Sequence, residues 1–263
     1  MTDQPDWTVP TQRSVAVPGV IVGAGIGTHY RKLFRSTINH CEVHCPDAWK
    51  LWYESLPANC PPHEESQYAF KIYALLRAVE GFQYILWMDA TFQPTASIEP
   101  LWERIRADGW YVAAQGAELG TWVSDAALNL FGISRDAAME IPLVYSGLVG
   151  LDLRHSLGNE IWRRWKEWHD AGAFNGPHRN LPGAPMAVWG EKWTGHCSLD
   201  PRCEGHRHDE AALSFVLHEM GLKPVPENWA SLGVGRHVPD YDVVKMRTLI
   251  IENIGSRRGD ARQ

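Results

Sequence analysis

Hydrophobic residues gather in short runs that recur along most of the chain. The strongest run covers residues 82–92, an apolar and aromatic stretch that follows Gly81 and precedes Pro94. Runs of this length and composition are typical of strands buried on both faces. The run contains a single carboxylate, Asp89, near its end. In open α/β sheets ligands bind beyond the carboxyl ends of the strands, so Asp89 is a candidate site residue, although it could also cap the next turn.

Further apolar runs, and segments with apolar residues at helical spacing between them, predict the remaining strands and helices. Apolar runs predict strands at 14–22, 41–45, 110–115 and 141–152. Apolar residues spaced three or four apart predict helices at 30–38, 49–56, 65–79, 97–108, 137–140, 160–171 and 210–220. Strands that alternate with helices in this way predict an α/β fold with a central, mostly parallel sheet flanked by helices.

Composition and charge narrow the class of protein. The 263 residues are 44% hydrophobic and contain no low-complexity linker, which predicts one domain over 14–255 with a flexible arm at 1–13 and a flexible tail at 256–263. A net charge of −6 does not favour a protein that coats nucleic acid. No signal peptide and no long apolar span is recognisable, so we expect a cytoplasmic protein without a membrane partner. Five cysteines, an odd number, indicate no disulfide framework.

A glycine-rich turn follows the first predicted strand. Gly23, Gly25 and Gly27 precede a predicted helix, a place where backbone N–H groups often bind phosphate. The dinucleotide-binding fingerprint would need a further glycine at position 28, where the chain has Thr28. A phosphate site and a tight turn without a ligand both remain open, and an NAD(P)- or flavin-dependent oxidoreductase is an alternative function.

A long segment, 173–205, is rich in Gly, Pro and Trp and shows no periodicity. Loops of this length in a compact domain usually serve a function, here closure over an acceptor. Histidines and cysteines that could bind zinc lie around its end: His196, Cys197, Cys203, His206 and His208. They either form a zinc site or are polar residues that line a cleft.

Charge in the predicted helices also bears on function. Lys71 lies off the apolar face of the helix at 65–79, either as a solvated charge or within reach of a phosphate. Asp209 and Glu210 open the helix at 210–220, where capping alone would also favour acidic residues.

Taken in order, these features resemble the GT-A-fold glycosyltransferases over roughly residues 14–240. The resemblance rests on the first strand and its small-residue turn, the helix with Lys71, the strand that ends in Asp89, the segment 145–153 and the late acidic pair. It implies a single GT-A-like (Rossmann-like) domain that binds a nucleotide-sugar donor. The family's D-x-D motif falls on positions 89–91, where Thr91 replaces the second acid.

The resemblance also implies roles for individual residues. Asp89 and His237 would hold a divalent cation, Mn²⁺ or Mg²⁺. Ser146 and Gly147 would lie beside the sugar, and Asp209 or Glu210 would act as base or contact a sugar hydroxyl. In such a transfer, negative charge builds up on the departing diphosphate, and cations or backbone N–H groups must stabilise it. The candidates are Gly23, Gly25, Lys71 and Arg207.

We therefore predict a glycosyltransferase that moves a sugar to an acceptor hydroxyl. A non-catalytic nucleotide- or carbohydrate-binding module is a further alternative, because Thr91 removes one acid. The acceptor is a saccharide, a small molecule or a modified nucleic-acid base. The last stays open because the long segment mixes basic and aromatic residues: Arg179, Trp189, Lys192, Trp193, Arg202 and Arg207.

Overall fold

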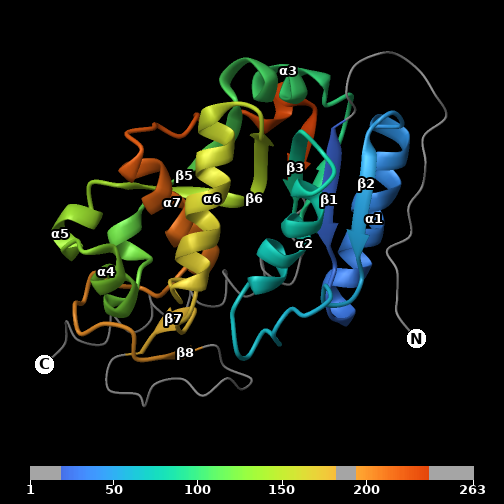
Figure 1. The fold of residues 1–263 in the computed structure, drawn as a ribbon. Helices are drawn as coiled ribbons and strands as arrows, with labels where there is room; N and C mark the ends of the chain where they lie inside the picture. The colour runs from blue at the N-terminus through green and yellow to red at the C-terminus, as the bar shows by residue number, and fades with distance from the viewer. Residues whose placement is uncertain (1–18, 182–193, 237–263) are drawn as a thin grey trace, which may run out of the picture.

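A twisted five-stranded sheet forms the centre of the molecule in the computed structural model, which describes residues 19–181 and 194–236 (Figure 1). Its strand order is β2-β1-β3-β6-β5. The strands are β1 (Val20–Ala24), β2 (Trp49–Tyr53), β3 (Tyr84–Met88), β5 (Trp110–Glu118) and β6 (Pro142–Asp152). Neighbours β2, β1 and β3 are parallel, whereas β6 is antiparallel to both β3 and β5. Four of these five strands thus run the same way, and the predicted α/β class is confirmed.

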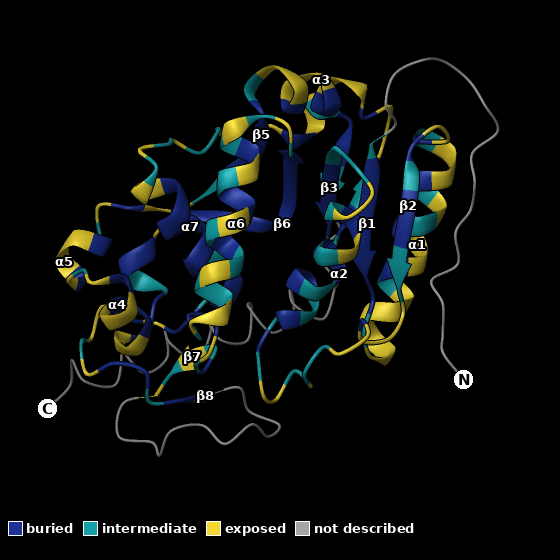
Figure 2. Ribbon diagram, viewed as in Figure 1, coloured by how far each residue is buried: buried dark blue, intermediate teal, exposed yellow. Residues whose placement is uncertain are grey.

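Helices cover both faces of this sheet (Figures 1 and 2). They are α1 (Thr28–His44), α2 (Ala69–Val79), α3 (Glu99–Asp108), α4 (Asp125–Phe131), α5 (Arg135–Ala138), α6 (Ser156–Asp170) and α7 (His208–Glu219). Short elements complete the described chain: β4 (Phe92–Pro94), η1 (Leu119–Thr121), β7 (Arg179–Asn180), β8 (Thr194–Gly195), η2 (Trp229–Leu232) and β9 (Val234–Arg236). Strand β4 pairs with β9, and β7 pairs with β8.

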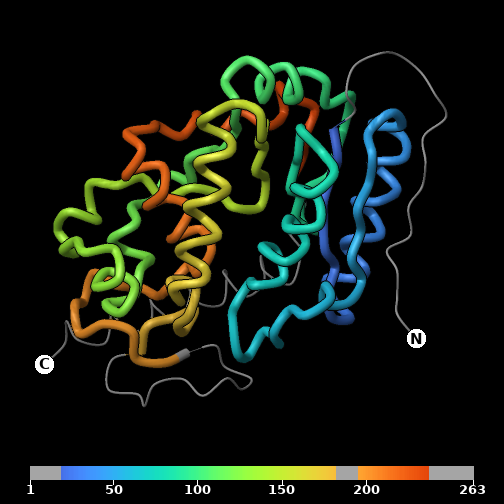
Figure 3. The backbone as a smooth tube through the Cα atoms, viewed as in Figure 1, coloured from blue at the N-terminus to red at the C-terminus, as the bar shows by residue number. Residues whose placement is uncertain are grey.

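Each face of the sheet has its own core, because side chains alternate along a strand. Val20 and Val22 of β1 point to the face where residues of α2, α6 and α7 pack. Ile21 points to the other face, which α1, α3 and η2 cover. Helix α7 lies directly against α6, as the adjacent yellow and orange tubes of Figure 3 show. Two helices from distant parts of the sequence, α2 and α7, therefore meet on the same face.

Two of the predicted elements are wrong. The strand predicted at 41–45 is the last part of α1, whose buried side carries Phe34, Thr37 and Cys41 at helical spacing. The helix predicted at 49–56 is strand β2, which pairs with β1 along its whole length. Both stretches are short and apolar, and periodicity does not separate strand from helix over so few residues.

Part of the predicted organisation lies outside the described residues. The arm at 1–13, the tail at 256–263 and the beginning of the predicted first strand belong to this group, so the domain limits 14–255 stay a prediction. Of the helices in the described ranges, none is long and apolar enough to cross a membrane.

Candidate active site

The carboxyl ends of β1 and β3 meet at one edge of the sheet. The register places Val22 of β1 beside Trp87 of β3. A Cβ atom on Gly23 would lie only 2.7 Å from the carbonyl oxygen of Met88, which shows how closely the two strand ends approach. Asp89 follows β3 directly, and its N–H donates to the carbonyl oxygen of Gly147 at 2.8 Å. The glycine turn, Asp89 and the middle of β6 therefore share this edge.

Lys71 reaches the same edge from α2, on the buried face of that helix. Its ammonium donates to the carbonyl oxygen of Ser146 at 2.9 Å, to the Ser146 hydroxyl at 3.0 Å and to Oδ2 of Asp209 at 2.5 Å. The Ser146 hydroxyl in turn donates to Oδ2 of Asp209 at 2.6 Å. The side chain of Lys71 is 1% exposed and that of Asp209 is 3% exposed. Lys71 is thus a buried partner of Asp209 and not a solvated charge.

The two carboxylates near Lys71 stabilise its positive charge. Burial lowers the pKa of Lys71, but Asp209 and Asp89 outweigh that effect, so the pKa is raised overall. The rings of Trp87 and Tyr68 lie 5.2 and 6.0 Å from the ammonium, within the range of a cation–π contact. Lys71 is therefore fully charged at neutral pH, and its three N–H donors are all used inside the protein.

Asp89 is the carboxylate of the cluster that solvent reaches. Its side chain is 32% exposed. Oδ1 accepts from the indole N–H of Trp87 at 2.6 Å and lies 3.5 Å from the ammonium of Lys71. Burial raises the pKa of Asp89, Lys71 lowers it and Asp209 raises it again, so the pKa lies above its ordinary value. Because protein groups hold Oδ1, Oδ2 is the oxygen best placed to meet a ligand.

Glu210 is a second carboxyl group at this edge whose pKa is raised. It lies in the first turn of α7, and its Oε2 is buried without a hydrogen-bond partner in the described ranges. Burial raises its pKa to about 7, Arg207 opposes the rise and Asp209 adds to it. A carboxyl group with a pKa near neutrality is suited to accept and release a proton. Asp209, held by Lys71 and Ser146, is less free to do so.

Two strained residues begin the helices that carry Lys71 and Asp209. Tyr68 precedes α2 with φ 56°, and His208 opens α7 with φ 44°. Left-handed backbone is unfavourable for residues other than glycine, and such residues cluster at functional sites. The two rings lie 5.2 Å apart, so the strain at both helix starts is concentrated in one place.

The first two glycines of the predicted turn serve packing; Gly23 lies within β1, and Gly25 follows that strand directly. A Cβ atom on Gly23 would also lie 2.8 Å from the ring of Phe34, and one on Gly25 would collide with the same side chain. The N–H of Gly25 already donates to the carbonyl oxygen of Tyr53 at 2.8 Å. These glycines let α1 lie close against β1, and the N–H of Gly25 is not available to a phosphate.

Arg207 precedes α7 and stacks on an aromatic ring. Its guanidinium carbon lies 4.4 Å from the ring centre of Trp122. Its Nε is buried and has no hydrogen-bond partner among the residues that the structure describes. Arg207 therefore has one buried N–H donor that no described residue uses. By contrast, Arg202 is paired with Asp200 and Asp136, while residues 182–193, with Trp189 and Lys192, lie outside the described part.

The described residues do not by themselves make up a divalent-cation site, and the predicted cation at Asp89 and His237 stays a prediction. No group of three or more His, Cys, Asp or Glu side chains that could hold a metal occurs within 19–181 and 194–236. Asp89 contributes one open oxygen beside the ammonium of Lys71, and Thr91 stands in the second acidic position. The other predicted ligand, His237, lies outside the described residues.

The predicted zinc ligands do not come together either. Nδ1 of His206 accepts from the N–H of Ser124, and its Nε2 lies 3.0 Å from the carbonyl oxygen of Ala173. Burial lowers the pKa of His206 to about 4, so its ring is neutral and bound to backbone. Cys197 and Cys203 do approach each other, but without a third ligand among the described residues.

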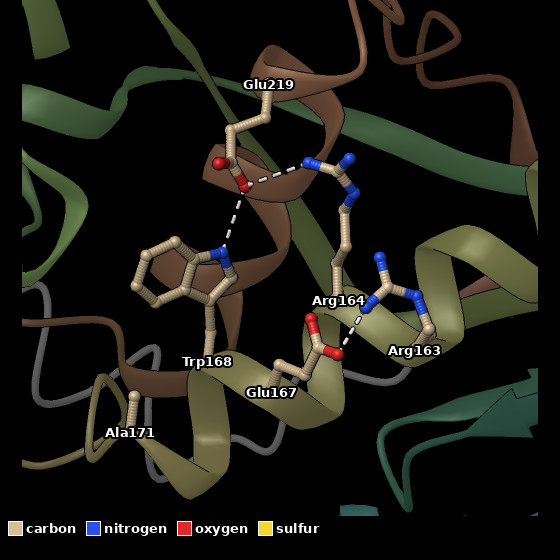
Figure 4. A pocket seen from close by; sticks show the side chains of 6 residues that line it. All are labelled: Arg163, Arg164, Glu167, Trp168, Ala171 and Glu219. Carbon is tan, nitrogen blue, oxygen red and sulfur yellow. Dashed lines mark hydrogen bonds and ion pairs between the residues drawn. The ribbon is translucent and has the colours of Figure 1, made fainter.

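A separate cavity of about 390 Å³ lies at the surface between α6 and α7 (Figure 4). Its charges are paired with one another: Arg163 with Glu167, and Arg164 with Glu219, which also accepts from Trp168. This cavity is lined by other residues than the cluster at the sheet edge, and its charges are already neutralised.

Sequence reasoning missed Tyr68 and Trp87 as parts of the site. The periodicity of 65–79 gives no sign that Tyr68 leaves the helical conformation. Trp87 belongs to a strand whose apolar pattern suggests packing alone, and its N–H bond to Asp89 depends on the turn after β3. The signal in the sequence is the position of Trp87 two residues before Asp89, from where its N–H can reach the carboxylate at the end of the strand.

Comparison with known proteins gives structural neighbours only. No protein-family model matches the chain, and no curated protein matches it. A galactosyltransferase, LgtC, solved with donor and acceptor sugar analogues, is 15% identical and aligns over 81% of this chain and 99% of its own, with a TM-score of 0.36. Mouse xyloside xylosyltransferase 1 is 11% identical over 80% of this chain and 85% of its own, with a TM-score of 0.44. A glycosyltransferase involved in glycosylation of the major capsid of PBCV-1 is 12% identical over 60% and 69%, with a TM-score of 0.35.

These neighbours are glycosyltransferases of the GT-A type, the fold family that the sequence resembles. All three identities lie below 25% and all three TM-scores below 0.5. They show a likeness of fold alone, and none of their activities, ligands or residue roles carries over to this chain.

Proposed function

We propose that this protein is a glycosyltransferase that moves a sugar from a nucleotide-sugar donor to an acceptor hydroxyl. The observation that supports it is the pairing at one sheet edge of an open carboxylate, Asp89, with a carboxyl group of pKa about 7, Glu210. The first can bind a donor, and the second can take a proton from an acceptor. The order of motifs along the sequence supports the same class.

In this proposal the fully buried residues position Glu210. Lys71 neutralises the charge of Asp209, Ser146 donates a hydrogen bond to it, and both contacts fix the beginning of α7. The indole N–H of Trp165 donates to the carbonyl oxygen of Asp209 at 3.0 Å and holds the same turn. Glu210, the next residue, is thereby placed on a rigid element, as a catalytic group must be.

The chemistry assigned to the site is a displacement at the anomeric carbon of the sugar. The bond from that carbon to the diphosphate oxygen breaks, and a bond to the acceptor oxygen forms. Glu210 accepts the proton of the acceptor hydroxyl. Oδ2 of Asp89 accepts a hydrogen bond from the donor, and Arg207 stabilises the charge that develops on the diphosphate. No step is assigned to a divalent cation.

A panel of nucleotide sugars tests the proposal through thermal unfolding. A ligand at a hundred times its Kd adds about 2.7 kcal/mol, which is about 5–10 °C in Tm for a domain of this size. We expect UDP- or GDP-sugars to raise Tm and NAD to leave it unchanged. A rise with NAD and none with any nucleotide sugar would favour the oxidoreductase alternative.

A turnover assay distinguishes a glycosyltransferase from a non-catalytic binding module. The module is an alternative because Thr91 replaces the second acid. A nucleotide sugar that raises Tm is incubated with the protein at micromolar concentration, and release of the nucleotide diphosphate is followed. Slow hydrolysis of the donor supports the transferase. Binding without any release, with saccharide and small-molecule acceptors also present, supports the module.

A further inference from the structure

Two cysteines outside the proposed site face each other. The sulfur atoms of Cys197 and Cys203 lie 3.7 Å apart, and both thiols are free. The residues are 8% and 5% exposed, in the segment that joins β8 to α7. Neither has a part in the proposed transfer.

The backbone holds this pair together independently of the sulfur atoms. The side chain of Asn180 accepts from the N–H of Cys197 at 3.0 Å and donates to the carbonyl oxygen of Cys203 at 3.1 Å. A disulfide needs its sulfurs about 2 Å apart. Side-chain rotation has to close the remaining gap, because Asn180 already clamps both ends of the loop 198–202.

The two thiols differ in reactivity. The hydrogen bond between the two sulfur atoms lowers the pKa of Cys203 to about 7; burial opposes this, and the nearby guanidinium of Arg135 favours it. The same hydrogen bond, together with burial, raises the pKa of Cys197. Since the thiolate is the nucleophilic form of cysteine, Cys203 is the sulfur that reacts first.

We propose that Cys197 and Cys203 form a reversible disulfide when the protein meets a peroxide. The Cys203 thiolate attacks one oxygen of hydrogen peroxide, the O–O bond breaks, and Cys203 becomes a sulfenic acid as hydroxide leaves. The thiol of Cys197 then attacks that sulfur, the S–S bond forms, and water leaves with the thiol proton. In total, two thiols and one peroxide give one disulfide and two waters. A dithiol reductant reverses the reaction.

The bridge closes the loop 198–202 just ahead of α7. Leu199 in that loop is 78% exposed, so the loop itself faces solvent, while the two cysteines beneath it are 8% and 5% exposed. Oxidation therefore restrains the segment that leads to Asp209 and Glu210. This inference does not depend on the proposed transferase activity.

Trypsin gives a direct test, because the chain has a cleavage site between the two cysteines. The folded protein is treated with hydrogen peroxide, free thiols are alkylated after unfolding, and the digest is examined by mass spectrometry. Cleavage after Lys192, Arg202 and Arg207 gives peptides 193–202 and 203–207. We expect these peptides linked, a loss of 2 Da in the intact protein, and three alkylated thiols in place of five. Sulfinic acid on Cys203 without the link would overturn the proposal.

The pair Cys41 and Cys45 is the matched control. These buried thiols also interact, but they are four residues apart at the end of α1, where Cβ atoms lie about 5–6 Å apart. A disulfide needs about 3.5–4.5 Å, so no link is expected between them. Equal linkage of both pairs would show a non-specific reaction and contradict the inference.

Stability gives a second readout. Bridging a loop of this size should raise Tm by about 5 °C in the wild type. Dithiothreitol should reverse the rise, and Cys197→Ser should never show it. An oxidised wild type that carries the link but melts at or below the reduced protein would contradict the inference that the loop is already poised for the bridge.

Discussion

Replacing Glu210 with glutamine should remove activity and make the protein more stable at alkaline pH. Gln keeps the shape of the side chain and cannot ionise. The pKa of Glu210 is about 7 in the folded protein, against an ordinary value of 4.5, chiefly because of burial. The folded protein therefore binds this proton more tightly than the unfolded chain does. The stabilisation that comes from protonated Glu210 is complete below pH 4 and disappears as the pH rises through 7.

The size of the effect follows from the difference between the two pKa values. One pKa unit corresponds to about 1.4 kcal/mol, so ionisation of Glu210 costs the folded state about 3 kcal/mol at pH 8. This is an upper value because the side chain is only partly buried. In the variant the cost is absent. We expect Glu210→Gln to raise Tm by up to about 6–12 °C at pH 8 and to change it little at pH 4.

Denaturant titrations of the wild type and of Glu210→Gln at pH 4, 6 and 8 measure this directly. Turnover measured in parallel should rise in the wild type as the pH passes 7, because the base must be deprotonated, and should fall about 10²–10⁴-fold in the variant. Asp209→Asn is the matched control one residue away, since it removes the nearer of the two carboxylate charges beside Lys71 and should lower stability at pH 8. Equal stability of Glu210→Gln and wild type at every pH would refute the assigned pKa.

Other substitutions probe the rest of the cluster. Lys71→Met leaves the buried Asp209 without its charged partner and should cost about 3–5 kcal/mol by denaturant titration, whereas exposed Lys32→Met should cost less than about 0.5; near-equal losses would contradict the buried pair. Asp89→Asn keeps the bond from Trp87 but loses the charge, so calorimetry should give at least tenfold weaker donor binding; unchanged affinity would remove Asp89 from the donor site. Gly147→Ala places a Cβ atom 2.9 Å from Oδ2 of Asp89 and should weaken donor binding, while Gly81→Ala, with open space around it, should not.

The sequence was most informative where local pattern determines structure. The apolar run before Asp89 predicts both the central strand and the carboxylate beyond its end, and β3 with Asp89 has this arrangement. The same local reasoning failed for Lys71. The apolar residues of α2 predict that Lys71 lies off the buried face of the helix. In the structure Lys71 is buried, because Ser146 and Asp209 pack against that side of α2 and bond to its ammonium. A buried charge depends on partners that periodicity along one helix does not contain.

The choice between Asp209 and Glu210 had the same limit. Side by side at the start of a helix, the two acids look equivalent in sequence. Lys71 and Ser146 come from α2 and β6 and bond to Asp209, whereas burial raises the pKa of Glu210 to about 7. Long-range contacts and burial therefore distinguish two acids that the motif leaves equivalent.

The buried cluster also fixes when the site can appear during folding. Lys71 lies 138 positions from Asp209 and 75 from Ser146 along the chain. Contacts of such separation close large loops and form late, after local helices such as α1. Donor binding during refolding should consequently lag behind the return of helical circular dichroism. A chain shortened before α7 would keep much of its local structure and yet have no site, so ligand binding reports on the last step of folding and not on the first.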